Sequence, residues 1–423
     1  PLRNLGLLIL DEEQESTYKS ENVPKYHARD VAKYRCAQND ALLVLGSATP
    51  SVESMYHAKR GDYRLFTLRR RYNEQALPEV LIADMKKELR AGNGTSLSGP
   101  LRAGLAAAME AGEQSILFLN RRGASRMVTC GECGEVPTCP RCSVHLTYHS
   151  ANGRLMCHYC GHSERSSDTC PVCGGIMKHV GTGTQKVEEE LHAAFPGREI
   201  LRMDTDTVSA TQSHEKLLSR FEKERIPVLV GTQMVAKGLD FENVTLVGVI
   251  SADLSLYVDD YRAGERTFSL LTQVVGRSGR FDLPGRAFIE TAQPHNPVFA
   301  LASAQDYEAF YREEILFRKV NLYPPFCSLL TVQFTSVSEA DSHAGARLFA
   351  RLFTRLAQAE YADLPIRMLG PAGDTLYRVA GKYRCHLILK CRNDRRMREL
   401  TRRVLEQFYA QAPAGVQAIP DLD

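Results

Sequence analysis

The most regular feature of this sequence is a set of short apolar runs that stop abruptly at polar or small residues. The run from Leu5 to Leu10 stops at an acidic triplet, and the run from Ala41 to Leu45 stops at Gly-Ser-Ala-Thr. Such a run is typical of a buried strand of a parallel sheet, and the carboxyl ends of these strands border the crevice where ligands bind. Further runs of this kind are Ser115 to Leu119, Val228 to Val230 and Val244 to Ile250.

Helical patterns separate these runs, for example from Lys186 to Ala194. Strands alternating with helices predict an α/β fold with parallel sheets. Near Tyr323-Pro324-Pro325-Phe326 the pattern changes, and a separate small α+β domain is expected to follow. Its expected elements are a strand in LLTVQFTS (329–336), a helix from about Glu339 to Gln358, a strand in CHLILKC (385–391) and a helix from about Arg395 to Gln411.

The composition is that of an ordinary folded protein, with 43% hydrophobic and 24% charged residues. A net charge of +3 is too small to indicate a nucleic-acid partner, so any such surface must be local. No apolar run approaches the roughly 18 residues of a transmembrane helix, so no membrane partner is expected. The chain starts at Pro1 without an initiator Met or a signal peptide, and we expect it to be the C-terminal part of something longer.

Eight of the 12 cysteines form four Cys-x-x-Cys pairs. The pairs are Cys130 and Cys133, Cys139 and Cys142, Cys157 and Cys160, and Cys170 and Cys173. A two-residue gap lets both thiolates of a pair bind one zinc, so the pairs predict two closed sites of four cysteines each, which supply much of this segment's folding free energy. A disulfide framework is the alternative, and it is disfavoured because nothing indicates secretion. Three histidines in the segment, His145, His149 and His158, are expected not to be ligands.

Two polar motifs follow the first two strands. Asp11-Glu12-Glu13-Gln14 has the form of a Walker B element, in which Asp11 holds the magnesium of a nucleotide and Glu12 polarises the attacking water. Alone, this motif is weak, because acidic residues after a strand usually mark a solvated strand end. Ser47-Ala48-Thr49 alone fits a helix cap or a turn.

A more specific motif is Gln-Val-Val-Gly-Arg-Ser-Gly-Arg at 273–280. Its two arginines, Arg277 and Arg280, suit bidentate contact with a γ-phosphate and its transition-state charge. Upstream, the stretch at 231–240 follows a strand and offers backbone amides and hydroxyls to phosphates.

In chain order, DEEQ, SAT, FLNRRG, VGTQMVAKGLDF and QVVGRSGR resemble motifs II to VI of superfamily 2 helicases. The cysteine pairs lie between motifs IV and V, and the sequence also contains YHARD (26–30), GTGTQKVEEEL (181–191) and YPPF (323–326). With these additions the chain resembles the PriA family of primosomal replication-restart helicases, or primosomal protein N′, over essentially its whole length.

The resemblance implies a bacterial cytoplasmic, ATP-dependent DNA helicase that moves 3′ to 5′, recognises stalled forks and initiates primosome assembly. It implies two Zn2+ ions and ATP with Mg2+ as cofactors. The implied partners are forked and single-stranded DNA, single-strand-binding protein and the primosome or helicase-loading proteins. One zinc is implied at Cys130, Cys133, Cys170 and Cys173 and the other at the inner four cysteines, although spacing alone leaves other pairings open.

The resemblance also assigns further site residues. Those implied to bind ATP or to couple its hydrolysis are Gln14, Ser47, Thr49, Gly238, Asp240 and Gln273. Those implied to contact DNA are Tyr18, Tyr26, His27, Arg29 and Thr232. Most of the second set lies in an aromatic-rich loop, whose rings suit base stacking but would equally serve to pack the loop. The arginine-rich stretch at 392–403 has two alternative interpretations, a solvated helix face and a surface that contacts phosphate.

The expected architecture has three parts. Residues 1–75 are the end of RecA-like lobe 1 with motifs II and III, and residues 76–322 are lobe 2 with motifs IV to VI and a zinc insertion at about 128–176. Residues 323–423 are the C-terminal α+β domain.

Two departures from the family pattern stand out. Gln14 replaces the usual His, and no G-x-x-x-x-G-K-[ST] phosphate loop occurs in the sequence. We expect that loop and the N-terminal DNA-binding region to precede Pro1, so this fragment is expected to be inactive alone. One rival interpretation is a non-catalytic zinc module that binds DNA or protein on a degenerate helicase scaffold, and a weaker one is a translocase that acts on RNA.

Overall fold

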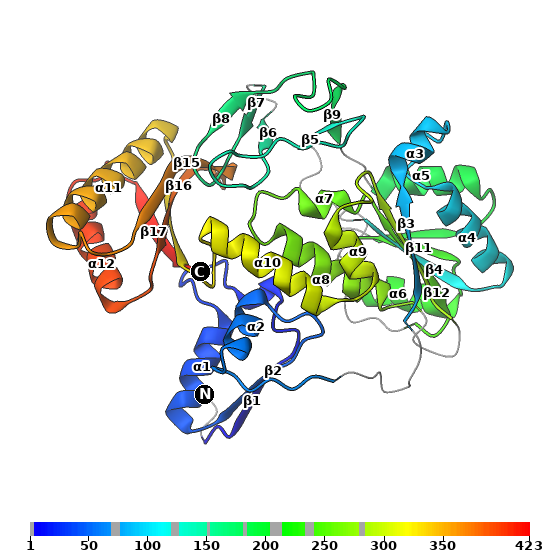
Figure 1. The fold of residues 1–423 in the computed structure, drawn as a ribbon, viewed down its shortest axis with the longest axis horizontal. Coiled ribbons are helices and arrows are strands. Elements are labelled where there is room, and N and C mark those ends of the chain that lie inside the picture. The colour runs from blue at the N-terminus through cyan, green and yellow to red at the C-terminus, as the bar shows by residue number, and fades with distance from the viewer. Residues whose placement is uncertain are drawn as a thin grey trace.

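The computed structural model describes residues 4–68, 77–119, 127–149, 153–180, 184–203, 214–232, 241–278 and 284–423. Figure 1 shows a small two-stranded unit beside helices α8 and α10, a large α/β unit, a cysteine-rich module and a C-terminal sheet flanked by two helices. Among the described residues, no helix combines the length and the apolar character needed to cross a bilayer.

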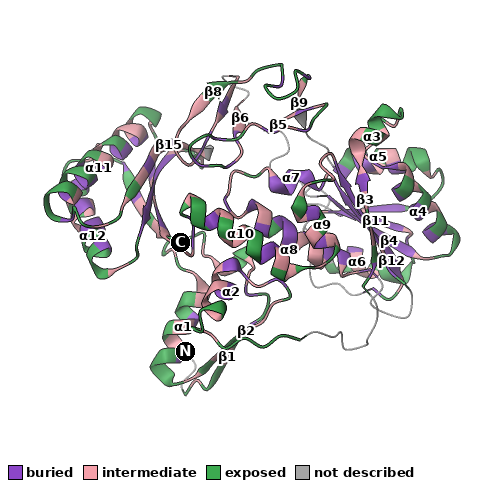
Figure 2. Ribbon diagram, in the orientation of Figure 1, coloured by how far each residue is buried: buried purple, intermediate pink, exposed green. Residues whose placement is uncertain are grey.

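The two-stranded unit contains β1 (Leu7–Leu10) and β2 (Leu42–Leu45), which pair in parallel. Helix α1 (Ala28–Asn39) connects them, and α2 (Val52–Lys59) follows β2. Both predicted strands are confirmed, each starting slightly later than expected. Leu7, Ile9 and Leu42 are more than half exposed, so the described residues leave one face of this sheet uncovered (Figure 2).

The large unit is a six-stranded sheet in the order β10-β11-β4-β12-β13-β3, and every neighbouring pair is parallel. Its strands are β3 (Glu79–Asp84), β4 (Gln114–Leu119), β10 (Ile200–Met203), β11 (Val228–Gly231), β12 (Val244–Ile250) and β13 (Arg286–Thr291). The predicted α/β fold with parallel sheets is confirmed, although β3, β10 and β13 were not expected as separate strands.

Alternate residues of the central strands pack against helices on opposite faces of this sheet. Ile116 and Phe118 join a core with α6, α8, α9 and α10, whereas Leu117 and Leu119 join a core with α4 and α5. The helices are α3 (Met85–Arg90), α4 (Gly99–Glu110), α5 (Thr184–Ala194), α6 (His214–Lys223), α7 (Asp253–Leu256), α8 (Ala263–Val275), α9 (Pro297–Ser303) and α10 (Tyr307–Asn321). Two covered faces explain why the strands are apolar without alternation.

The cysteine-rich module lies between β4 and β10 in the chain, as an insertion within the α/β unit. Its strands are short and antiparallel, in one pair and one triplet. They are β5 (Met127–Cys130), β6 (Thr147–His149), β7 (Arg154–Met156), β8 (Ser163–Arg165) and β9 (Met177–Val180). The predicted insertion in lobe 2 is therefore confirmed.

The C-terminal domain is an antiparallel sheet in the order β15-β16-β14-β17. Its elements are β14 (Ser328–Ser336), α11 (Glu339–Glu360), β15 (Arg367–Val379), β16 (Lys382–Cys391), α12 (Arg395–Tyr409) and β17 (Gln417–Leu422). One face packs against α11 and α12. The other face contributes Leu329, Leu369 and Ile388 to a core shared with the cysteine-rich module. The predicted α+β domain is confirmed, with β15 and β17 in addition.

Candidate functional site

The eight paired cysteines gather into two cages. Within each cage all four sulfur atoms lie within 4.8 Å of one another. The outer cage is Cys130, Cys133, Cys170 and Cys173, and the inner cage is Cys139, Cys142, Cys157 and Cys160. The sulfur atoms of Cys130 and Cys173 are 3.5 Å apart and those of Cys139 and Cys160 are 3.7 Å apart. A zinc–sulfur distance of about 2.3 Å in a tetrahedron requires a separation of roughly 3.8 Å, so both cages fit zinc.

The pairing is nested, as the resemblance implied. None of the described histidines joins either cage, and all cysteines are reduced. The disulfide framework is therefore not what the structure contains, and two Zn2+ sites account for all eight paired thiols.

Each Cys-x-x-Cys pair lies in the same tight turn. The residue that follows the second cysteine donates its backbone N–H to the carbonyl of the first, at 3.0 Å for Gly134 and 2.9 Å for Gly161. That residue has a positive φ in all four turns, and it is glycine in three and Ser143 in the fourth. Glycine adopts this conformation without a steric cost. The glycine that follows three of the four pairs was the available sequence signal for this turn.

The two cages differ in their surroundings. Cys133 and Cys173 of the outer cage are exposed, whereas Cys139, Cys142 and Cys157 of the inner cage are buried in the core shared with the C-terminal sheet. The inner cage is thus part of a domain interface, and the outer cage faces solvent.

The YPPF motif explains part of this interface. The Tyr323 hydroxyl, fully buried, donates to the carbonyl of Cys142 at 2.9 Å. Its ring stacks on Tyr261, with centroids 4.6 Å apart. His158, next to a zinc ligand, contacts the Gly373 carbonyl through Nδ1 at 2.6 Å, and its own carbonyl is contacted by His386 Nε2. The inner zinc module, lobe 2 and the C-terminal domain therefore share one set of contacts.

A matched pair of glycine variants tests this docking. Gly161 and Gly174 occupy equivalent turns with φ values of 74° and 77°, but a Cβ on Gly161 would lie 2.9 Å from the Pro371 carbonyl oxygen, whereas a Cβ on Gly174 would meet nothing within 4 Å. Both alanine variants should weaken zinc retention, each by about 1 kcal/mol. Only Gly161→Ala is expected to raise hydrogen exchange in the C-terminal sheet. Equal exchange in the two variants would mean that the docking contact is unimportant.

The predicted Walker B residues lie at the carboxyl end of β1. Asp11 and Glu12 are exposed, and Glu12 has a φ of 48°, a strained value for a residue with a side chain. Gln14 donates to Glu12 Oε2 at 2.6 Å and accepts from the Ser47 hydroxyl at 2.5 Å. Two exposed carboxylates offer the oxygen ligands that magnesium prefers. Gln14 thus links Glu12, which follows β1, to Ser47, which follows β2.

Contacts between the β1–β2 unit and lobe 2 bring further predicted residues together. Gln273 of α8 donates to Glu12 Oε2 at 3.2 Å, and the hydroxyl of Thr49 lies 2.8 Å from that of Ser269. Arg277 follows α8 one helical turn after Gln273. Helix α8 therefore places Gln273, the first residue of the 273–280 motif, against the Glu12 carboxylate.

The predicted DNA-contacting loop folds as a small hairpin. Lys19 and His27 form an antiparallel bridge, and the hydroxyl of Tyr18 donates to the Asp11 carbonyl at 2.8 Å. Tyr26 is half exposed. His27 caps α1, and burial together with the neighbouring Arg29 lowers the pKa of its imidazole.

Arg29 has a protein partner in this structure. Its guanidinium donates to Glu13 at 2.7 Å, and Glu13 also accepts from the Ser51 backbone at 2.7 Å and from the Ser54 hydroxyl at 3.0 Å. Burial opposes the charge on Arg29, but the neighbouring carboxylates, chiefly Glu13 and Glu53, together outweigh it and raise the pKa of the guanidinium. Arg29 thereby joins the loop to motif II.

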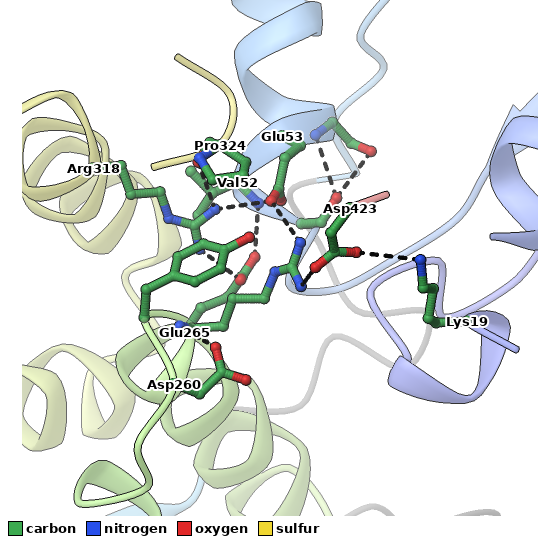
Figure 3. A network of polar contacts seen from close by, with 12 residues as sticks. Lys19, Val52, Glu53, Asp260, Glu265, Arg318, Pro324 and Asp423 are labelled. Carbon is green, nitrogen blue, oxygen red and sulfur yellow. Dashed lines mark hydrogen bonds and ion pairs between the residues drawn. The ribbon is translucent and has the colours of Figure 1, made fainter. Parts of the chain in front are cut away.

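A buried ionic network, which the sequence did not suggest, lies beneath these motifs (Figure 3). Arg318 of α10 is fully buried and lies 3.1 Å from Glu53, 2.7 Å from Glu265 and 3.0 Å from Glu314. Burial would raise the pKa of Glu53, but Arg318 and Arg262 lower it to about 2. The position of Arg318, seven residues after the buried Tyr311, was the available signal, because this spacing puts both on one helix face.

Arg280, Gly238 and Asp240 lie outside the described residues. Thr232 is partly buried just after β11.

Three family patterns match this chain. The "PriA DNA helicase Cys-rich region (CRR) domain" matches residues 139–165, the "Helicase conserved C-terminal domain" matches 179–282, and the "Primosomal protein N C-terminal domain" matches 320–420. These matches follow the order of the cysteine-rich module, lobe 2 and the C-terminal sheet.

Curated relatives match almost the entire chain. The replication restart protein PriA of Bacillus subtilis is 43% identical over 409 residues, covering 96% of this chain and 50% of the relative. That of Treponema pallidum is 39% identical, covering 100% of this chain and 63% of the relative. That of Synechocystis is 40% identical, covering 92% and 48%. The chain therefore spans between about half and two thirds of the length of these relatives.

Proposed function

Because this chain belongs to the PriA family of replication restart proteins, we propose that it supplies the C-terminal part of an ATP-dependent DNA helicase, including the second lobe of its motor. The proposed helicase moves 3′ to 5′ in the bacterial cytoplasm, binds stalled forks and single-stranded DNA, and starts primosome assembly with single-strand-binding protein and helicase-loading proteins. In this proposal residues 1–75 complete lobe 1, residues 76–322 form lobe 2, and residues 323–423 form the C-terminal domain.

One observation carries the proposal. The Gln273 amide nitrogen of lobe 2 lies 3.2 Å from the Glu12 carboxylate of lobe 1. Hydrolysis by such a motor needs groups of both lobes around one phosphate, since the charge that develops there is stabilised from two sides. The Gln273–Glu12 contact supports this arrangement.

The chain's own groups have distinct proposed roles. Asp11 would hold the magnesium of ATP, which neutralises charge on the phosphates when bound. Glu12 orients the attacking water, and Gln14 connects Glu12 with Ser47. Arg277 and Arg280 stabilise the transferred phosphoryl group. Tyr18, Tyr26 and His27 contact nucleic acid, and Arg29 connects that loop to Glu13.

The experiment is ATP hydrolysis by the full-length gene product with no nucleic acid, with single-stranded DNA and with RNA of the same sequence. We expect stimulation by DNA well above that by RNA. Stimulation by RNA alone would favour an RNA translocase, and the absence of hydrolysis with every polymer would favour a non-catalytic scaffold. Partial duplexes with a single 3′ or 5′ tail then test direction. A 3′ to 5′ motor should unwind the substrate with the 3′ tail, because it moves along that tail toward the duplex.

A further inference from the structure

The loop hairpin is held by the acidic end of the C-terminal strand. Lys19 Nζ lies 2.6 Å from Asp421 Oδ1 and donates to the Leu422 carbonyl at 2.8 Å. The same nitrogen is 3.8 Å from Asp423, and Lys25 Nζ is 4.0 Å from Asp421. Two cations of the hairpin thus face two carboxylates that follow them by about 400 residues.

The acidic end is itself fixed in place. Strand β17 pairs with β14, and the backbones of Leu329 and Asp423 exchange hydrogen bonds at 3.1 and 2.8 Å. The Asp423 carboxylate accepts from Arg262 at 2.6 Å. Burial would raise the pKa of Asp423, but Arg262 and Lys19 outweigh it and lower the pKa. The Asp423 carboxylate is therefore held in its ionised form, at a strand end that is hydrogen-bonded to β14.

We propose that Asp421 and Asp423 occupy a nucleic-acid phosphate site at Lys19 and Lys25, so that the chain's own acidic end competes with DNA for the hairpin. This inference rests on the proposed function. Lysine binds phosphate as a point charge and does not demand a particular acceptor geometry, so a phosphodiester replaces a carboxylate readily. When the two carboxylates pair with these lysines, the hairpin is held in the position that it has without DNA.

Nucleic acid is the partner that fits this site. Tyr26, half exposed, follows Lys25 in the chain, so the hairpin offers both a ring that suits base stacking and cations that suit phosphate. The hairpin also reaches the nucleotide motif, because Tyr18 donates to the Asp11 carbonyl. Displacing the acidic end therefore frees a segment that touches Asp11.

The test measures binding of a fluorescent oligodeoxythymidine of about 20 nucleotides to the full-length protein by anisotropy over a range of salt. The Asp421→Asn/Asp423→Asn variant should bind roughly three- to tenfold more tightly than the wild type, since the three competing ion pairs are gone. Adding Lys19→Gln and Lys25→Gln should abolish that gain. Asp421→Asn alone, which leaves Asp423 with Arg262, guards against loss of folding.

The matched control is Glu199→Gln/Glu224→Gln. It removes the same charge from two exposed carboxylates that pair with Arg220 of lobe 2. If the control tightens binding as much as the Asp421 and Asp423 variant does, simple charge explains the gain and the proposal is overturned.

A second readout separates this proposal from the proposed function. Acylation of Lys19 and Lys25 by an N-hydroxysuccinimide ester, followed by mass spectrometry without nucleic acid, should be several-fold faster in the Asn variant. Unchanged acylation overturns the internal competition whatever the binding result. If no variant binds the oligonucleotide at low salt, the proposed function fails, and acylation still reports whether the acidic end covers the lysines.

Discussion

Replacing Arg280 with alanine in the full-length gene product is expected to lower DNA-stimulated ATP turnover by roughly 10³- to 10⁵-fold. The QxxGRxGR pattern places Arg280 last in motif VI, where a guanidinium stabilises negative charge that grows on the transferred phosphoryl group in the transition state. Because that charge is largest in the transition state, nucleotide affinity should change little. ATP turnover and affinity for a fluorescent ATP analogue, measured side by side, test whether turnover falls while nucleotide affinity is kept.

Two comparisons sharpen this experiment. Arg280→Lys should recover little, since an ammonium does not reproduce a planar two-pronged contact. Arg198→Ala removes an exposed lobe 2 arginine that belongs to none of the motifs and should leave turnover unchanged. Near-normal turnover of Arg280→Ala would show that another residue serves as the arginine finger.

Replacing Cys157 with serine is expected to remove one zinc and to unfold the inner half of the module. Structural zinc contributes about 10–16 kcal/mol of apparent binding free energy, comparable with the stability of a whole domain. Because the inner cage shares its core with the C-terminal sheet, hydrogen exchange should rise in β14 and β16 as well. Metal analysis and exchange mass spectrometry measure both effects.

The controls come from the same residue type. Cys133→Ser opens the solvent-facing outer cage and should also remove one zinc, but exchange in the C-terminal sheet should stay normal. Cys36→Ser alters a buried thiol that belongs to neither cage and should leave both zinc ions bound. Retention of two zinc ions by Cys157→Ser would contradict the assigned ligands.

The zinc ligands and the α/β core could be predicted because their signals are local. A two-residue gap turns two thiolates toward one metal, and apolar strands such as β4 and β12 need no partner to be identified. The inner and outer grouping was not fixed by spacing. It depends on how four equivalent turns fold on one another.

The missed elements have physical reasons. Strand β15 is interrupted by Gly370 and Pro371, and β17 contains Pro420, which is tolerated because β17 is an edge strand. The contacts of Arg29 and Lys19 also could not be predicted from the sequence. Their partners are brought to them only by tertiary folding, and a cationic side chain in a loop gives no sign of whether phosphate or carboxylate will meet it.

The nested grouping of the cysteines also determines the order in which the two zinc sites are completed during synthesis. Cys160 completes the inner cage before Cys173, the last outer ligand, has been made. At roughly 5–20 residues per second, the interval is on the order of a second, long enough for the inner cage to capture its metal first. Strands β10, β11, β12 and β13 are translated later still. Without zinc, a nascent chain would therefore carry an unfolded module between the first two strands of its largest sheet, β3 and β4, and the four strands that follow.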